Sequence, residues 1–116
     1  MKLISHYTYP DWGREIMLME QCGYAFARIY MYKNDDTAYI ESLSVNVEVR
    51  HKGFGAQLMK QIEEIALNTL GVSQLGLSVN ENSWMHGWYE RLGYVDSGWD
   101  NDALCNIWML KPLNNS

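Results

Sequence analysis

The spacing of apolar residues first changes near residue 50, and that change limits the folds the chain can adopt. In the segment 24–32 apolar side chains occupy every second position, which is the period of a half-buried strand. In the segment 54–70 they recur every three or four positions, which is the period of a helix with one buried face. Antiparallel strands are therefore expected first, followed by a long helix.

The same reasoning divides the rest of the chain into short elements. Gly71 and Gly93 stand where two helices are expected to end, since glycine readily adopts the left-handed conformation of a C-cap. The predicted elements are strands at 2–9, 15–21, 24–32, 38–45, 74–79, 94–99 and 104–110, and helices at 54–70 and 83–92. The order β-β-β-β-α-β-α-β-β predicts an α+β fold with a mixed, mostly antiparallel sheet. Its strands before and after the long helix should be parallel neighbours.

Length and hydropathy predict a single domain over residues 1–116. With 116 residues, 47% of them hydrophobic, the chain can bury about two-thirds of its unfolded surface. No apolar run approaches the roughly 18 residues that a membrane span needs, and the first residues lack the apolar core of a secretory signal. We therefore expect a cytoplasmic protein with no membrane partner.

The charge of the chain argues against nucleic acid as a partner. Nine Lys and Arg stand against fourteen Asp and Glu, so the formal net charge is -5, and the longest basic cluster is Arg50-His51-Lys52. Cys22 and Cys105 have no partner at metal-ligand spacing, so neither a metal site nor a disulfide is expected. Both should be reduced, buried thiols.

Gly53 and Gly55 follow that basic cluster at the predicted strand-to-helix junction. The free N–H groups and the dipole of a helix N-terminus hold anions, so the segment 43–55 is a candidate phosphate loop. An ordinary glycine turn with solvated basic residues is the alternative. A dinucleotide fingerprint fits poorly because Leu58 occupies the third glycine position, and a P-loop would need a Gly-Lys-Ser/Thr sequence that does not follow.

Two motifs around this junction resemble those of the GNAT superfamily of N-acetyltransferases. The family's acetyl-CoA loop, Arg/Gln-x-x-Gly-x-Gly/Ala, resembles Arg50-x-x-Gly53-x-Gly55. Its second motif, Asn-x-x-Ala-x-x-aromatic/Leu-Tyr-x-x-x-Gly-Phe, is similar to Asn82-x-x-Met85-x-x-Trp88-Tyr89-x-x-x-Gly93-Tyr94. Two motifs in this order, with a predicted helix and strand between them, are far more specific than either one. The resemblance extends over roughly residues 14–111.

The resemblance implies an N-acetyltransferase that uses acetyl-CoA as co-substrate. The backbone of Leu43, Ser44 and Val45 would pair with the pantetheine arm like an extra strand. Asn82 would contact the same arm from the facing side. The pyrophosphate would lie against the start of the long helix, at Arg50, His51, Lys52, Gly53, Phe54, Gly55 and Ala56.

Tyr89 matches the family's general acid, a phenol that protonates the departing coenzyme A thiolate. Read without the flanking motif, Tyr89 would be a half-buried aromatic residue on an amphipathic helix. Asn82 likewise has an alternative role as the N-cap of the second helix, since asparagine is among the best capping residues.

An amine acceptor also needs a base. An amine with a pKa near 10.4 is about 3.4 units too protonated at pH 7, so presenting it uncharged costs ~4.6 kcal/mol. Glu41 is the first candidate to collect that proton, through water, because it lies two residues before Leu43; an exposed strand carboxylate is the alternative. Glu81 and His86 are weaker candidates. The neutral amine would attack the thioester directly, with the Val45 N–H stabilising the oxyanion.

The chain departs from the family pattern in its first half. GNAT proteins commonly carry one or two helices between the first two strands, and residues 9–15 leave no room for them. Val47 stands where many members have proline, and Met85 where many have alanine. The acceptor site is therefore expected to be open or completed by a second subunit, and the many aromatic residues favour a homodimer.

The acceptor remains a small-molecule or peptide amine of undefined identity. A non-catalytic module that binds acyl-CoA is the second hypothesis, which retains the loop but has no working acceptor site. A nucleotide-binding oxidoreductase domain is disfavoured by the missing third glycine and by the antiparallel first half.

Overall fold

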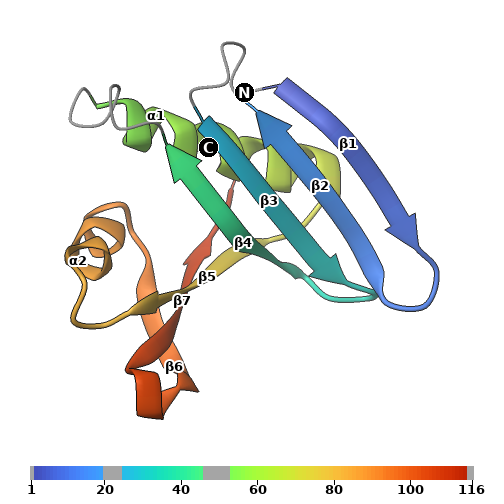
Figure 1. The fold of residues 1–116 in the computed structure, drawn as a ribbon. Helices are drawn as coiled ribbons and strands as arrows, with labels where there is room; N and C mark the ends of the chain where they lie inside the picture. Colours follow the sequence, from blue (N-terminus) through green and yellow to red (C-terminus); the bar gives the residue numbers. More distant parts are fainter. Residues whose placement is uncertain (1, 20–24, 46–52, 115–116) are drawn as a thin grey trace.

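Seven strands form one sheet with two helices (Figure 1). The structure is a computed structural model that describes residues 2–19, 25–45 and 53–114. The strands are β1 (Lys2–Tyr9), β2 (Gly13–Met19), β3 (Ala25–Tyr32), β4 (Thr37–Val45), β5 (Gln74–Asn80), β6 (Val95–Asn101) and β7 (Asn106–Pro112). The helices are α1 (Phe54–Ile65) and α2 (Trp84–Arg91). The predicted element order is confirmed.

The strand order is β1-β2-β3-β4-β5-β7-β6. Every neighbouring pair is antiparallel except β4 and β5, which are parallel and connected through α1. This confirms the mixed, mostly antiparallel sheet and the parallel pair around the long helix, because such a crossover requires a helix between its strands.

The sheet opens between β4 and β5. Only Thr37, Ala38 and Tyr39 of β4 pair with β5, at Gln74, Leu75 and Gly76. Beyond Tyr39 the two strands diverge, β4 toward the start of α1 and β5 toward α2 (Figure 1). The β5-facing edge of β4 from Ile40 to Val45 therefore has no strand partner in β5, while its other edge remains paired with β3 as far as Val45.

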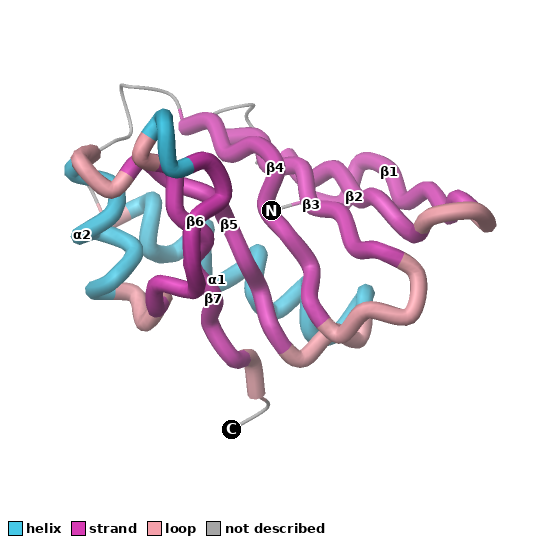
Figure 2. Tube along the Cα trace, turned by 90° about the horizontal axis from the view of Figure 1, so that it is seen from below, coloured by secondary structure: helices cyan, strands magenta, loops and turns pink. Residues whose placement is uncertain are grey.

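The core lies on one face of the sheet. Alternate residues of the strands join buried residues of both helices in a single apolar cluster, which includes Ile16, Ile29, Leu77, Met109, Ile62 and Tyr89. α1 covers this face, and no described helix lies over the opposite one (Figures 1 and 2). The residues between the buried ones, such as Tyr30 and Tyr32, therefore occupy the uncovered face.

The first two strands form a hairpin without intervening helices. Tyr9 pairs with Gly13 across a short turn, as the lack of room between residues 9 and 15 predicts. The helix predicted over 54–70 is α-helical to Ile65 and continues as a π-helical turn over Ala66–Leu70, ending at Gly71 in the left-handed conformation (φ 71).

Smaller corrections concern the C-terminal half. β6 runs through Asn101, two residues beyond the expected end, so Asp100 and Asn101 also belong to the strand. Cys105 is a free thiol, and it is partly exposed rather than buried as predicted. Cys22 lies outside the described residues. No helix in the described part of the chain is long and apolar enough to span a membrane.

Candidate active site

The first turn of α1 presents donors that its own side chains do not cap. Gly53 occupies the N-cap position in the left-handed conformation (φ 72) and makes no side-chain capping bond. The first N–H groups of a helix have no acceptor within the helix, so those of Phe54, Gly55 and Ala56 are available to an anion. Arg50, His51 and Lys52 are predicted to bind the same anion, but they lie outside the described residues.

The two glycines of this motif serve different purposes. Gly53 is needed for its backbone conformation, because side chains other than glycine rarely adopt a φ of 72. Gly55 is needed for space, since a Cβ there would lie 3.0 Å from the Trp88 ring. Gly55 thus packs α1 against α2 and brings the two predicted motifs into contact.

β4 changes its side-chain orientation at a bulge beside the opening. Arg28 pairs with Ser42 and Ile29 with Ile40, so Glu41 is the extra residue between them. Ile40 faces the core, whereas Glu41 contacts Arg28 on the uncovered face. Leu43 returns to the core side, where it packs against the apolar cluster. The bulge therefore places Glu41 and Leu43 on opposite faces of the sheet at the opening.

Glu41 has one described ionic partner. Its Oε2 lies 3.4 Å from Arg28 Nε, and its side chain is 48% exposed. Arg28 makes its shorter contact, a hydrogen bond of 2.9 Å, to Glu15. Because the Glu41 contact is long and the carboxylate is half exposed, water can reach Glu41, as a water-mediated base would require.

Tyr89 lies on the opposite, helix-covered face. It is 4% exposed in the core between Trp88 and Tyr94, whose ring centroids are 5.0 and 5.7 Å away. Burial raises the pKa of Tyr89 to about 12, so the phenol carries its proton at neutral pH. A group that stays protonated can act as an acid.

Asn82 is not the cap of α2, so the capping role considered for it is wrong. Ser83 is the N-cap, and its hydroxyl accepts a hydrogen bond from the Met85 N–H at 3.2 Å. Asn82 lies one residue earlier in the turn after β5, where its N–H donates to the Asn80 side chain at 2.9 Å. The Asn82 side chain is exposed and therefore available for a ligand.

His86 is held by two carboxylates. Its Nε2 lies 2.7 Å from Asp96 and its Nδ1 3.2 Å from Glu90. The hydrogen bond to Asp96 raises the pKa of His86, and with both ring nitrogens engaged the side chain is poorly suited to act as a base. Glu81 lies in the turn before α2, where its N–H donates to the Cys105 carbonyl.

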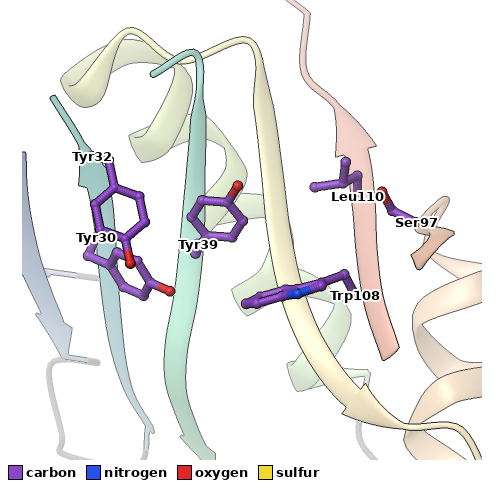
Figure 3. Close-up of a pocket in the computed structure, with 6 residues that line it drawn as sticks. All are labelled: Tyr30, Tyr32, Tyr39, Ser97, Trp108 and Leu110. Carbon is purple, nitrogen blue, oxygen red and sulfur yellow. The ribbon is translucent and has the colours of Figure 1, made fainter. Parts of the chain in front are cut away.

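The uncovered face carries an aromatic hollow that the sequence reasoning missed. It has a volume of about 260 Å³ and is lined by Tyr30, Tyr32, Tyr39, Ser97, Trp108 and Leu110 (Figure 3). These residues come from β3, β4, β6 and β7, on both sides of the point where β4 and β5 part. The sequence held one indication of this hollow. Tyr30 and Tyr32 alternate with the buried Ile29 and Met31, which places both tyrosines together on the face of the sheet opposite the core.

A sequence model of the acetyltransferase (GNAT) family matches residues 11–94. The chain belongs to the GNAT acetyltransferase family. The matched residues include the motif from Arg50 to Gly55, the motif from Asn82 to Tyr94, and the residues of β4 and β5 beside the opening. No curated protein matches the chain in a sequence comparison.

Solved GNAT structures have the same fold. An acetyltransferase from Bacillus cereus is 26% identical, with a TM-score of 0.66 over 85% of this chain and 73% of that one. A GNAT acetyltransferase from Elizabethkingia anophelis with acetyl-CoA bound is 18% identical, with a TM-score of 0.68 over 90% and 79%. A chimeric spermidine N-acetyltransferase from Vibrio cholerae is 16% identical, with a TM-score of 0.67 over 90% and 69%.

Membership of the GNAT family supports an acyltransferase that uses an acyl-CoA co-substrate. The described residues fit such a ligand in two respects. The uncapped first turn of α1 suits a pyrophosphate. The β4 edge beyond Tyr39, which lacks a partner in β5, suits the amide groups of a pantetheine arm.

Proposed function

We propose that this chain is an N-acetyltransferase that moves an acetyl group from acetyl-CoA to a primary amine by direct attack. The observation that carries the proposal is the opening between β4 and β5, which has the uncapped N-terminus of α1 near one end (Figure 1). Tyr89, a protonated phenol, belongs to the helix-covered face, and Glu41, a carboxylate, to the other.

In this proposal the backbone and the glycine loop bind the co-substrate. Leu43, Ser44 and Val45 pair with its pantetheine arm, and Asn82 contacts the arm from the turn before α2. The residues proposed to hold the pyrophosphate are Arg50, His51, Lys52, Gly53, Phe54, Gly55 and Ala56. Acetyl-CoA supplies the thioester.

The proton transfers divide between the two faces of the sheet. Glu41 accepts, through water, a proton from the acceptor ammonium, which leaves a neutral amine. The nitrogen forms its bond to the acetyl carbon as the carbon–sulfur bond breaks, and the N–H of Val45 stabilises the charge on the carbonyl oxygen. Tyr89 donates its proton to the departing thiolate, the acylated nitrogen releases its extra proton to solvent, and a proton from solvent then restores the Tyr89 phenol.

The test is a panel of amines monitored by release of free thiol from acetyl-CoA, with acetyl-CoA binding measured separately by thermal shift. An enzyme should bind acetyl-CoA and release thiol only when an amine is present, and mass spectrometry should find the acetylated amine. Binding without amine-dependent release would support a non-catalytic acyl-CoA module instead. Absence of binding would reject both functions.

The setting of the enzyme is also a proposal. We propose a homodimer in the cytoplasm, with no nucleic acid or membrane partner. The exposed side chains of Trp84 and Trp99 favour an association between subunits, and the free thiol of Cys105 suits a reducing compartment. Light scattering of the purified chain tests the dimer.

A further inference from the structure

The aromatic hollow is continuous with the opening between β4 and β5. Tyr39 belongs to the last residue pair between these strands, and its partner Gly76 lies beneath the hollow. A Cβ on Gly76 would lie 2.8 Å from Leu110 and 3.0 Å from Tyr39. Only glycine at this position therefore lets the side chains of β4 and β7 approach each other across β5.

The walls of the hollow are aromatic rings in mutual contact. The centroid of the Tyr39 ring lies 5.5 Å from that of Tyr30 and 5.4 Å from that of Trp108. Figure 3 shows Tyr39 between the two β3 tyrosines on one side and Trp108 on the other. Such rings offer a ligand flat faces with negative electrostatic potential, which attract cations.

Carboxylates lie around these rings. The charge of Glu41 acts on Tyr30, and those of Asp35 and Asp36 act on Tyr39. On the β7 side, Ser78 pairs with Trp108 and donates a hydrogen bond of 2.8 Å to Asp100. The hollow therefore has acidic groups on more than one side.

Two described basic residues on or next to β3, Arg28 and Lys33, are already engaged. Arg28 contacts two carboxylates, Glu15 and Glu41, so these three groups together carry a negative charge. Lys33 is directed toward the turn between β1 and β2, where its Nζ contacts the Pro10 carbonyl at 3.4 Å. The charges around the hollow are thus complementary to a cation rather than to an anion or a neutral group.

We propose that the hollow binds an alkylammonium group of the acceptor, so that the preferred acceptor is a diamine. This inference rests on the proposed function, because the second amine is the one that is acetylated. Glu41 is two residues beyond Tyr39 on β4, about 7 Å along the strand. One nitrogen lies over the rings while the other lies beside Glu41 at the opening. At about 260 Å³ the hollow has room for a head group but not for a folded partner.

Binding can be measured without turnover by using choline, whose quaternary nitrogen cannot be acetylated. Its uncharged isostere dimethylbutanol has the same shape. Calorimetry on the full chain should give choline an affinity at least about tenfold higher than dimethylbutanol, because only choline gains the cation–ring interaction. Equal affinities, or no binding of choline, would overturn the proposal.

Two variants locate the site. Trp108→Leu removes one wall of the hollow and should abolish the preference for choline. Tyr7→Leu removes an exposed aromatic residue that does not line the hollow and should leave the preference unchanged. Circular dichroism checks that both variants fold. If Trp108→Leu does not fold, Tyr32→Leu replaces it as the variant that removes a wall of the hollow. A preference that survives loss of a wall in a folded variant contradicts the assignment.

Kinetics connect the hollow to acceptor choice. Cadaverine should have a kcat/KM at least about tenfold above that of pentylamine, which lacks the second cation, and choline should raise the KM for cadaverine only. Choline binding with no thiol release from any amine would reject the proposed function but not the cation site. Equal turnover of the two amines with no choline binding would reject the cation site but not the proposed function.

Discussion

Tyr89 differs from the other buried tyrosine beside it in what holds its hydroxyl. The Tyr94 hydroxyl donates to Glu63 at 3.0 Å, and Lys111 bonds the same carboxylate at 2.8 Å, so Tyr94 belongs to a structural network under α1. Burial alone accounts for the raised pKa of Tyr89. The two residues can therefore be compared directly. Loss of the Tyr89 hydroxyl tests a role in catalysis, and loss of the Tyr94 hydroxyl tests a role in stability.

Replacing Tyr89 with Phe should lower kcat by about a hundredfold or more, the usual contribution of a general acid, without changing the affinity for acetyl-CoA. Tyr94→Phe should leave kcat near the wild-type value and cost about 1 kcal/mol or more of stability. Steady-state kinetics, acetyl-CoA calorimetry and thermal melts separate these effects. A Tyr89→Phe enzyme with full kcat would exclude the acid role.

The pH dependence of the rate provides an independent test of Tyr89. Because the folded-state pKa is raised to about 12, above its usual value of 10, the phenol keeps its proton below pH 10 and gradually loses it as the pH rises through about 12. We expect kcat to show no loss assignable to Tyr89 up to about pH 10. A basic limb near pH 8 that disappears in Tyr89→Phe would contradict this.

Glu41 can be tested against the other carboxylate that contacts Arg28. Glu41→Gln should lower kcat/KM for an amine by about a hundredfold near neutral pH, since the base is lost. Glu15→Gln also removes a partner of Arg28, but it lies on β2, away from the opening, and should change kcat/KM little. Equal losses in both variants would mean that Glu41 acts only by pairing with Arg28.

At single positions the sequence predicted residue types better than their exact roles. The sequence predicted that Gly53 and Gly55 both serve to bind an anion, whereas in the structure Gly55 leaves room for the ring of Trp88. It chose Glu41 by its distance from Leu43, but a bulge cannot be read from alternation, and the bulge decides which face Glu41 occupies. The cap of α2 shifted from Asn82 to Ser83 because both residues are good caps at adjacent positions.

Among the elements, α2 and β6 are joined by a side-chain hydrogen bond of His86. His86 on α2 bonds Asp96 on β6 and Glu90 within its own helix. The contact to Asp96 joins an element of the second motif to a strand whose residues are all exposed. The stability of this attachment should therefore depend on whether His86 is protonated.

His86→Gln tests that dependence. The folded-state pKa of His86 is raised above its usual 6.5, so its contribution is fully present below pH 6.5 and is lost as the pH rises through the folded-state pKa. The wild type should exceed the variant in Tm at pH 6 by an amount that shrinks toward pH 8.5. Partly exposed pairs of this kind contribute at most about 1 kcal/mol, or roughly 4 °C in Tm. If the Tm difference between wild type and variant grew with pH, protonation of His86 would not stabilise the fold.

Element types were predictable because their periods are strong. Alternation located β3, and the helical period with Gly71 located the long helix, since both patterns follow directly from which face is buried. The π-helical turn over Ala66–Leu70 was not predictable, because its apolar residues fit an α-helix equally well. The length of β6 was missed since Asp100 and Asn101 favour turns but here continue an exposed strand.

At the scale of the whole molecule, the sheet consists of two parts joined at one end. β1 to β4 form one part, β5, β7 and β6 the other, and three residue pairs connect them. The sequence predicted that β4 and β5 would be neighbours but not how many residues would pair. That number depends on how both helices pack, including the contact between Gly55 and Trp88, and no local pattern encodes it.

A ligand in this opening should join the two parts. If acetyl-CoA pairs with β4, backbone amides between Ile40 and Val45 that do not bond β3 should gain protection from hydrogen exchange. At a concentration a hundredfold above its Kd, acetyl-CoA should also stabilise the fold by about 2.7 kcal/mol.

ADP is the control, because it has a diphosphate but no pantetheine arm. It should protect amides at the start of α1, near Gly55, and leave β4 unchanged, since only the arm can reach the strand. Mass spectrometry of peptides covering 40–45 and 53–59 distinguishes these responses. Protection of α1 by both ligands with none of β4 by acetyl-CoA would show that the opening does not hold the arm, and the transfer proposed between Tyr89 and Glu41 would then lack its thioester.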